Sequence, residues 1–292
     1  MADEMPHAEG VEHRFVDANG VRVHVAEAGP PEAPAVLLLH GWPQHWYMWR
    51  RVMGGLSGEY RLLAPDLRGF GWTEAPGHGY DGETFAVDQV ALLDALGLER
   101  AHVVGHDWGG WTAMLLGILH ADRVDRIVVC NAPHPWPRLS LRLAMESWRS
   151  WYTWLIATPM IGRRALESEW VARQYIRLNA GLPLTDEEVE IYARSFREPG
   201  RAQAVVELYR YYQRVLWQTA RGEWRGRRLT RPTVLLFGEG DVSLSTRLLP
   251  GYEPYADDMR VETVPDSGHF IVDEKPDLVI ERMREWLGAA VA

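Results

Sequence analysis

The sequence of 292 residues is poor in cysteine and in lysine, with only Cys130 and Lys275. A single cysteine excludes an internal disulfide and a metal site built from cysteine pairs. We expect Cys130 to be a small core residue, because it closes the apolar run 127–130. The motifs described below require neither a metal ion nor a cofactor, and none is expected.

Long hydrophobic runs and a targeting segment are also absent. No apolar run approaches the roughly 20 residues that a membrane-spanning helix needs. Residues 1–4 are acidic and have no apolar stretch behind them, unlike a signal peptide. We therefore expect a cytoplasmic protein, which could form a homodimer.

Basic residues are fewer than acidic ones, 31 against 40. The formal net charge is -9 and the isoelectric point lies near 5.7. Nucleic acids and anionic membranes bind clustered basic charge, so neither is an expected partner. A chain of this length can bury a large core, as one α/β domain with an insertion or as two domains.

Short apolar runs bounded by turn residues predict the strands of a mostly parallel sheet. Helical patterns such as 85–96 separate several of them, as in a sheet wrapped by helices. The predicted strands are residues 21–25, 35–39, 61–64, 102–104, 127–130, 233–237 and 260–264.

The alternation stops after Pro133 and returns only at Thr233. The stretch between is rich in Trp, Tyr and Arg and is typical of several helices, one of them starting at Thr185 with acids in its first turn. We therefore predict a core made of residues 1–136 and 229–292, with a helical lid, residues 137–228, inserted near the carboxyl ends of the strands.

The strongest local motif is Gly-His-Asp-Trp-Gly-Gly at residues 105–110, between a predicted strand and a predicted helix. This is the pattern of a nucleophile elbow, a turn so tight that its flanking positions must be small and that lifts one side chain clear of the sheet. An aspartate in a turn is usually a helix cap, but the context favours Asp107 as a nucleophile. Its carboxylate would displace a leaving group from a saturated carbon and form an ester, which water must then hydrolyse.

Ester hydrolysis needs a general base, which His269 in a Ser-Gly-His-Phe loop offers after the last predicted strand. Asp241, directly after the strand 233–237, is the candidate acid that orients it, with Glu239 as a weaker rival. The order nucleophile, acid, histidine is the chain order of α/β hydrolases.

An oxyanion hole is offered by His-Gly-Trp-Pro at residues 40–43, directly after the strand 35–39. The backbone amides of Trp42 and Trp108 are predicted to point at the ester oxygen. Pro43 fixes the turn and makes a cis peptide bond possible. His40, Pro43 and His106 are candidates for lining the substrate pocket, although packed residues are the alternative for the histidines.

These motifs together resemble the α/β-hydrolase epoxide hydrolases, and haloalkane dehalogenases share much of the same frame. The resemblance runs from about Val11 to Leu287 and rests on residues 40–44, 66–71, 105–110, Asp241 and 267–269. It implies an α/β-hydrolase fold: a mostly parallel sheet flanked by helices, with an inserted helical lid. It also implies a pair of lid tyrosines that act on the epoxide oxygen.

The leaving group distinguishes the two activities. Halide needs only hydrogen-bond donors, whereas the alkoxide of an opening epoxide must be protonated, and tyrosine with a pKa of about 10 can donate at neutral pH. Tyr152 stands seven residues before Pro159, which resembles the family's spacing, and Tyr209-Arg210 resembles the pair that carries the second tyrosine.

Other lid aromatics stay open as alternatives. Tyr212 shares the apolar face of the helix 202–217 and is the second choice for the second donor, Tyr192 is the third, and Tyr211 is placed on the polar side. Trp148, Trp151, Tyr152 and Leu155 share one predicted helix face. We expect Trp148, Trp151 and Tyr212 to contact a small apolar epoxide.

Three other functions compete. A haloalkane dehalogenase could use the Trp108 indole for the halide, but such enzymes often have Asn where Trp42 stands and an acid where Asn131 stands. A non-catalytic binding protein of the same fold would show an incomplete site, and here every position is filled. A serine esterase would need a serine at residue 107. Asp66 and Arg68 are interpreted as an ion pair that fixes their loop.

Overall fold

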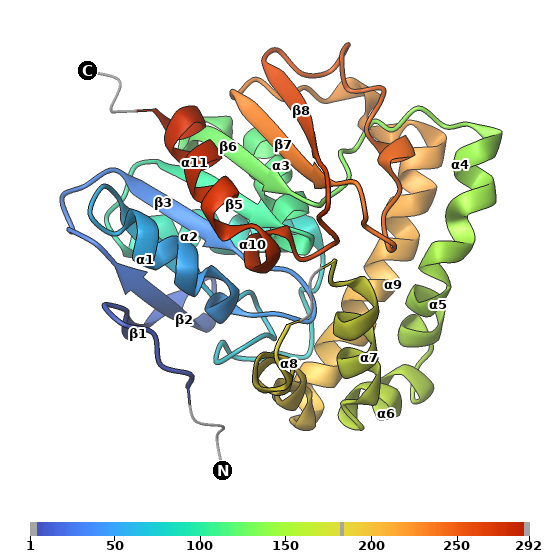
Figure 1. Ribbon diagram of the computed structural model, residues 1–292, viewed down its shortest axis with the longest axis horizontal. Coiled ribbons are helices and arrows are strands. Elements are labelled where there is room, and N and C mark those ends of the chain that lie inside the picture. Colours follow the sequence, from blue (N-terminus) through green and yellow to red (C-terminus); the bar gives the residue numbers. More distant parts are fainter. Residues whose placement is uncertain (1–4, 182–183, 289–292) are drawn as a thin grey trace.

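The structure, a computed structural model, describes residues 5–181 and 184–288. Its centre is an eight-stranded sheet with the strand order β1-β2-β4-β3-β5-β6-β7-β8 (Figure 1). The strands are β1 Glu12–Ala18, β2 Val21–Ala28, β3 Ala35–Leu39, β4 Arg61–Pro65, β5 Ala101–His106, β6 Val124–Cys130, β7 Thr233–Gly238 and β8 Met259–Val264.

The predicted strands are confirmed as β2 to β8, and burial explains why the central ones have apolar sequences. Every residue of β3 and of β7 is buried, as expected where helices cover both faces of a parallel sheet. β1 was not predicted. It pairs antiparallel with β2 at the edge of the sheet, and its mixed, largely exposed sequence lacks a strand pattern.

Helices cover both faces of the sheet (Figure 1). α1 packs against α11 on one face, and α2 packs against α3 on the other. The core helices are α1 Arg50–Leu56, α2 Gly82–Ala95, α3 Trp108–Leu119, α10 Ile271–Glu274 and α11 Pro276–Leu287. Cys130 lies fully buried at the end of β6, as predicted for a core residue.

Between β6 and β7 the described part of the chain is helical and forms a separate layer beside the sheet (Figure 1). α8 starts at the predicted place, where Thr185 and Glu188 form a capping box. α9 lies between the core and α4–α5. The helices of this layer are α4 Leu141–Glu146, α5 Trp151–Ala157, α6 Ile161–Glu167, α7 Trp170–Asn179, α8 Asp186–Ala193 and α9 Pro199–Arg221. In the described ranges, no helix has the length and apolar character needed to cross a bilayer.

The predicted ion pair between Asp66 and Arg68 is wrong. The Asp66 carboxylate turns inward and accepts hydrogen bonds from the Trp46 amide at 2.8 Å and the His24 ring at 2.7 Å. Arg68 instead forms a two-pronged pair with Asp88 of α2, at 2.8 Å and 2.6 Å. Two residues of one loop, Asp66 and Arg68, thus bind different parts of the core. Their spacing in the sequence does not show which partner each one takes.

The Arg68–Asp88 pair predicts a measurable stability difference along one helix. Asp88→Asn leaves the buried Arg68 guanidinium without its counter-charge, and we expect a loss of about 3–5 kcal/mol in the free energy of unfolding. Asp94 lies on the same helix but is 65% exposed in its pair with Arg123, so Asp94→Asn is expected to cost about 1 kcal/mol at most. Urea unfolding midpoints compare the two; equal losses would contradict the assignment.

Candidate active site

Asp107 occupies a strained turn between β5 and α3, as the elbow motif predicted. Its backbone has φ 51°, in the left-handed region that few non-glycine residues adopt. A Cβ at Gly105 would stand 2.2 Å from the Gly109 carbonyl oxygen, and one at Gly109 would stand 2.1 Å from the Leu39 carbonyl oxygen. The flanking glycines are therefore required by close backbone contacts, and they let the turn project the Asp107 side chain.

Two backbone amides hold the Asp107 carboxylate. The Trp42 amide donates to Oδ2 at 3.0 Å, and the Trp108 amide also donates to this carboxylate. The Trp42–Pro43 peptide bond is cis. A Cβ on Gly41 would lie 2.4 Å from the Asp107 Cβ, so the loop after β3 must carry glycine there. These two amides are the donors predicted for the oxyanion hole.

His269 lies between two carboxylates. Its Nδ1 is 2.8 Å from Asp241 Oδ2, and its Nε2 is 4.0 Å from Asp107 Oδ1. Among the described residues, Nε2 has no hydrogen-bond partner although it is buried. The gap between Nε2 and Asp107 therefore lets a molecule placed beside the carboxylate contact this nitrogen.

Asp241 is held by the loop that follows β7. Its Oδ1 accepts the amides of Ser243 at 2.8 Å and Leu244 at 2.9 Å, and its Oδ2 also accepts the Asn131 side-chain amide at 2.8 Å. The rival acid Glu239 points away and accepts a hydrogen bond from the Thr263 hydroxyl at 2.8 Å. The structure therefore places Asp241, not Glu239, beside the histidine.

Burial and charge shift the pKa values of all three groups. Burial raises the pKa of Asp107 to about 6, although His269 and the two amides favour its charged form. Burial alone would lower the pKa of His269, but the attraction and hydrogen bond of Asp241, with help from Asp107, raise it to about 9. For Asp241 burial again opposes charge, and the pKa falls below its usual range because of His269, the Leu244 amide and Asn131.

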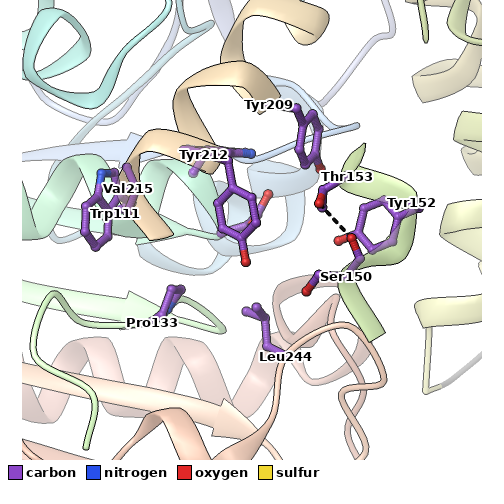
Figure 2. A pocket seen from close by; sticks show the side chains of 11 residues that line it. Trp111, Pro133, Ser150, Tyr152, Thr153, Tyr209, Tyr212, Val215 and Leu244 are labelled. Carbon is purple, nitrogen blue, oxygen red and sulfur yellow. Dashed lines mark hydrogen bonds between the residues drawn. The ribbon is translucent and has the colours of Figure 1, made fainter. Parts of the chain in front are cut away.

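A cavity of about 50 Å³ opens over Asp107 beneath the lid helices (Figure 2). Tyr152 of α5 and Tyr209 and Tyr212 of α9 all line it, with ring centroids 6.1 Å apart for Tyr152–Tyr209 and 6.4 Å for Tyr209–Tyr212. In Figure 2 the Tyr212 hydroxyl points toward Pro133 and Leu244. Burial raises the pKa of each of the three phenols above its usual value, so all three stay protonated at neutral pH.

Comparison with known proteins places this arrangement in a family. The alpha/beta hydrolase fold family matches residues 34–276. Human epoxide hydrolase 4 is 30% identical over 274 residues, which cover 89% of this chain and 74% of that protein. Epoxide hydrolase A of Mycobacterium tuberculosis is 31% identical over 316 residues, covering 94% and 96%. The solved structure of epoxide hydrolase CorEH without ligand has a TM-score of 0.83 at 26% identity, covering 95% and 98%.

This chain belongs to the epoxide hydrolase family of α/β hydrolases. The match confirms the resemblance carried by the sequence motifs, and it confirms the predicted fold class. In the residues that the structure describes, no group of three or more His, Cys, Asp or Glu side chains is arranged to hold a metal ion.

Several residues predicted to contact substrate do not line the cavity of this family member. Trp148 and Trp151 are largely exposed, because residues 147–150 form a 3₁₀ turn and α5 begins only at Trp151, which rotates both indoles outward. His40 is fully buried and accepts the Leu67 amide at 2.9 Å, so it fixes its own loop.

His106 and Pro43 also lie behind the cavity wall. His106 is fully buried, and its Nε2 lies 2.8 Å from the His269 carbonyl oxygen, where it anchors the backbone of the histidine loop. Pro43 is buried in the loop after β3 and is not among the cavity-lining residues. For both, the packed alternative describes the structure better than substrate contact.

Two tyrosines differ from their predicted places. Tyr192 is fully buried away from the cavity, with its hydroxyl 3.4 Å from an Arg50 nitrogen, so it is not a third donor candidate. Tyr211 was placed on a polar face but is buried. Its hydroxyl donates to Glu83 at 2.8 Å and accepts the Trp111 indole at 3.3 Å, so α9 packs against the core on this side too.

Sequence reasoning missed Tyr175 of α7. Its hydroxyl lies 3.4 Å from the Tyr152 hydroxyl and 2.9 Å from Ser243 Oγ, and its ring centroid is 4.5 Å from that of Trp42. The Ser243 hydroxyl in turn donates to the Asn179 side chain. Only the helical position of Tyr175 in an aromatic lid could have drawn attention to it, and that signal is weak.

A second, larger cavity of about 390 Å³ adjoins the first. Both cavities share Ser150, Tyr212 and Leu244 as lining residues. The larger one lies between α4, α9 and the loop after β7, and its wall combines aliphatic side chains and Trp154 with polar residues that include Glu146 and Arg149. The site thus consists of a narrow cavity over Asp107 and an adjoining, largely apolar chamber.

The charge arrangement predicts how His269 titrates. We expect its imidazole to lose its proton near pH 9 rather than near the ordinary value of about 6.5, because Asp241 stabilises the imidazolium. Asp241→Asn removes that charge while burial remains, so the pKa is expected to fall to or below the ordinary value. NMR titration of the His269 ring signals measures it.

Asp266→Asn is the matched control, because Asp266 is exposed and lies three residues from His269 in the chain. It should leave the His269 pKa unchanged. An unchanged pKa in Asp241→Asn would show that Asp241 does not govern this histidine.

Proposed function

We propose that this protein hydrolyses an epoxide to a vicinal diol through a covalent ester on Asp107. The observation that carries the proposal is a single cavity with a carboxylate on the core side and the phenols of Tyr152 and Tyr209 on the lid side. Opening an epoxide needs a nucleophile at carbon and an acid at oxygen, and this cavity offers both. The names of the relatives point to the same reaction.

In the first step, an Asp107 oxygen attacks a ring carbon and the bond from that carbon to the ring oxygen breaks. The ring oxygen keeps the electron pair of the broken bond and accepts a proton from Tyr152 or Tyr209. That tyrosine becomes a phenolate. Burial of Asp107 leaves its carboxylate poorly solvated, which favours attack on a neutral electrophile. The raised pKa values of the tyrosines keep the proton available for this transfer.

In the second step, water adds to the carboxyl carbon of the ester while His269 Nε2 takes one of its protons. The amides of Trp42 and Trp108 hold the negative oxygen that forms. The diol oxygen then takes the proton from His269 as the ester bond breaks, and the remaining water proton restores the phenolate. Ester formation also removes the Asp107 charge that helps to keep His269 protonated. The pKa of the histidine falls, and its resting proton passes to solvent before Nε2 acts as the base.

Tyr175 is assigned a positioning role in the first step. A phenolate on Tyr152 needs a hydrogen-bond donor, and the Tyr175 hydroxyl is its neighbour at 3.4 Å. Because a hydroxyl can rotate, Tyr175 can donate to Tyr152 while Ser243 remains within reach at 2.9 Å. This chain of hydroxyls would orient Tyr152 and spread the charge that develops on it.

Halide release is less well supported as the reaction. A halide needs free N–H donors, but the Trp108 indole already donates to the Tyr209 hydroxyl. The residue at the place of the second acid in many dehalogenases is Asn131, which here donates to Asp241 instead of acting as an acid. A non-catalytic binding role would not require the hydrogen-bonded pair of His269 and Asp241.

The adjoining chamber supports an elongated apolar substrate. The cavity over Asp107 is small, so a bulky substituent on the epoxide must extend past Tyr212 and Leu244. The chamber beyond offers aliphatic walls and the Trp154 ring. We therefore propose an epoxide with an apolar arm, its reactive ring held over Asp107.

Isotope transfer tests the covalent mechanism. In a single turnover with excess enzyme in ¹⁸O-water, the label should appear in the peptide that contains Asp107 and the diol should stay largely unlabelled. His269→Gln removes the base of the second step and spares the first, so an ester with the mass of the substrate should accumulate on Asp107. Mass spectrometry of peptides and diol gives both readouts.

His78→Gln, at an exposed histidine, should behave like the natural enzyme. Labelled diol in the first turnover, with no adduct in His269→Gln, would mean that water opens the ring directly and that Asp107 is not the nucleophile.

Replacement of the lid phenols tests the acid. Tyr152→Phe and Tyr209→Phe should each slow ester formation, and the double variant should lose about 10²- to 10⁴-fold, because the alkoxide then lacks a proton donor. Tyr211→Phe is the matched control on the same helix, since its hydroxyl is bound to Glu83 outside the cavity. Stopped-flow measurement of a single turnover gives the rate.

Two further variants sharpen this test. Tyr175→Phe should lower the rate of ester formation several-fold with little change in KM. In a protein that already carries Tyr152→Phe, the same substitution should have no further effect. If Tyr212→Phe slows ring opening as much as Tyr209→Phe, the second donor is shared or misassigned. A double variant of Tyr152 and Tyr209 that kept the natural rate would rule out the tyrosine mechanism.

A further inference from the structure

The outermost lid helices expose a row of large apolar side chains. Leu141, Met145, Trp148, Trp151 and Trp154 are between 58% and 79% exposed, and we call them the lid stripe. They recur every three or four residues along α4, the 3₁₀ turn that follows and α5, so they fall on one side of this segment. In Figure 1, α4 and α5 lie at the edge of the molecule, with α9 between them and the sheet.

Such a stripe is unusual on a surface that meets only water. Single exposed apolar residues are ordinary, but a contiguous row of them marks a surface that binds something. Three of the five members are tryptophans, the residue enriched where proteins meet the membrane–water interface. Their amphipathic rings suit the headgroup region of a bilayer, and an amphipathic helix lying in that plane is an established mode of binding.

The charges around the stripe favour an anionic surface. The region 137–228 holds sixteen arginines against ten carboxylates, whereas the rest of the chain holds fifteen basic and thirty acidic residues. The lid region therefore carries a net positive charge, although the net charge of the whole chain is negative. Because salt screens charges beyond about 10 Å, the charges on the stripe segment itself, Arg142, Glu146 and Arg149, contribute most to a surface contact.

Arg142 on this segment is exposed, and Arg149 lines the chamber close enough to Glu146 to lower the pKa of that carboxylate. The one carboxylate on the segment, Glu146, is already bound by Ser245 and by Arg247 at 2.7 Å. A second copy of the chain packed on the stripe would bring the arginines of both copies together at one interface. An anionic lipid surface would instead neutralise them.

The stripe also borders the apolar chamber. Trp154 belongs to the stripe and also lines the chamber, together with Leu139 and Leu143, which are not members of the stripe. The chamber meets the cavity over Asp107 at Tyr212 and Leu244. An apolar molecule leaving a lipid surface at the stripe would thus reach the reactive cavity without crossing bulk water.

We propose that the lid stripe docks the protein peripherally on anionic lipid bilayers and faces the chamber toward them. The docking does not depend on the proposed reaction; only the route of the substrate does. The stripe lies flat on the interface in this proposal, and no segment crosses the bilayer.

Cosedimentation of the full-length protein with vesicles tests the proposal. Binding should be strong to phosphatidylcholine mixed with phosphatidylglycerol, weaker to phosphatidylcholine alone, and partly reversed when salt is raised from about 0.1 M to about 1 M. The variant with both Trp148→Ser and Trp151→Ser should lose at least about tenfold in vesicle affinity, because it removes apolar area without touching the cavity.

Trp170→Ser is the matched control, since Trp170 is an equally exposed lid tryptophan on α7 outside the stripe. It should bind vesicles like the natural protein. Both variants should keep their circular dichroism spectrum and their rate on a water-soluble epoxide, which separates loss of docking from loss of fold or of the proposed function.

Three results would overturn the docking proposal. The first is no binding of the natural protein to either kind of vesicle. The second is unchanged binding by the double tryptophan variant. The third, from analytical ultracentrifugation, is a dimer that the double variant converts to a monomer in the absence of vesicle binding, which would make the stripe a contact between two copies.

Discussion

The constraint on which the site depends is the burial of one charged carboxylate in a tight turn. In the proposed mechanism Asp107 must be ionised, yet burial works against its charge and raises its pKa to about 6. The Trp42 and Trp108 amides and the His269 ring offset that cost. Their geometry needs glycine at the neighbouring positions, where any Cβ would collide with backbone or with Asp107 itself. The elbow after β5, the loop after β3 and the histidine loop after β8 are therefore one electrostatic unit at the carboxyl ends of the strands.

In the proposed mechanism the sheet and the lid supply opposite halves of the chemistry. The core provides fixed dipoles and charges, because strand ends and short loops hold the amides and Asp241 in place. The lid provides neutral phenols in apolar surroundings, which keep their protons because burial disfavours the phenolate. Tyr175 links the halves, since its hydroxyl reaches both Tyr152 and the Ser243 loop that also holds Asp241. In the mechanism proposed for this family member, charge created on the lid side would be shared with the core through this contact.

The sequence predicted what is local and left open what depends on packing between layers. Asp107, Asp241 and His269 stand in short motifs whose glycines and strand contexts can be recognised without a structure. Seven strands were apparent from apolar patterns, which are continuous in 35–39 and alternate in 21–25. The edge strand β1 was missed because its burial is slight and its pattern is mixed. The environment of the lid side chains was harder to predict. Helical periodicity shows which residues share a helix face, but not whether that face points to the core or to solvent. A 3₁₀ turn at residues 147–150 rotates Trp148 and Trp151 outward, and Tyr211 is buried because α9 contacts the core as well as α5.

The apolar faces of the lid explain why helical periodicity misleads there. A helix on a globular protein normally has one apolar side, and the other side meets water. Along α5, Thr153 and Ile156 are buried toward the molecule, while Trp151 and Trp154 on the outer side are exposed. A helix with large apolar residues on its outer side is adapted to a second apolar neighbour, and the adjoining chamber accounts only for Trp154. The tryptophan content of the lid therefore reflects its outer surface as well as its pocket, and substrate size cannot be inferred from the number of tryptophans alone.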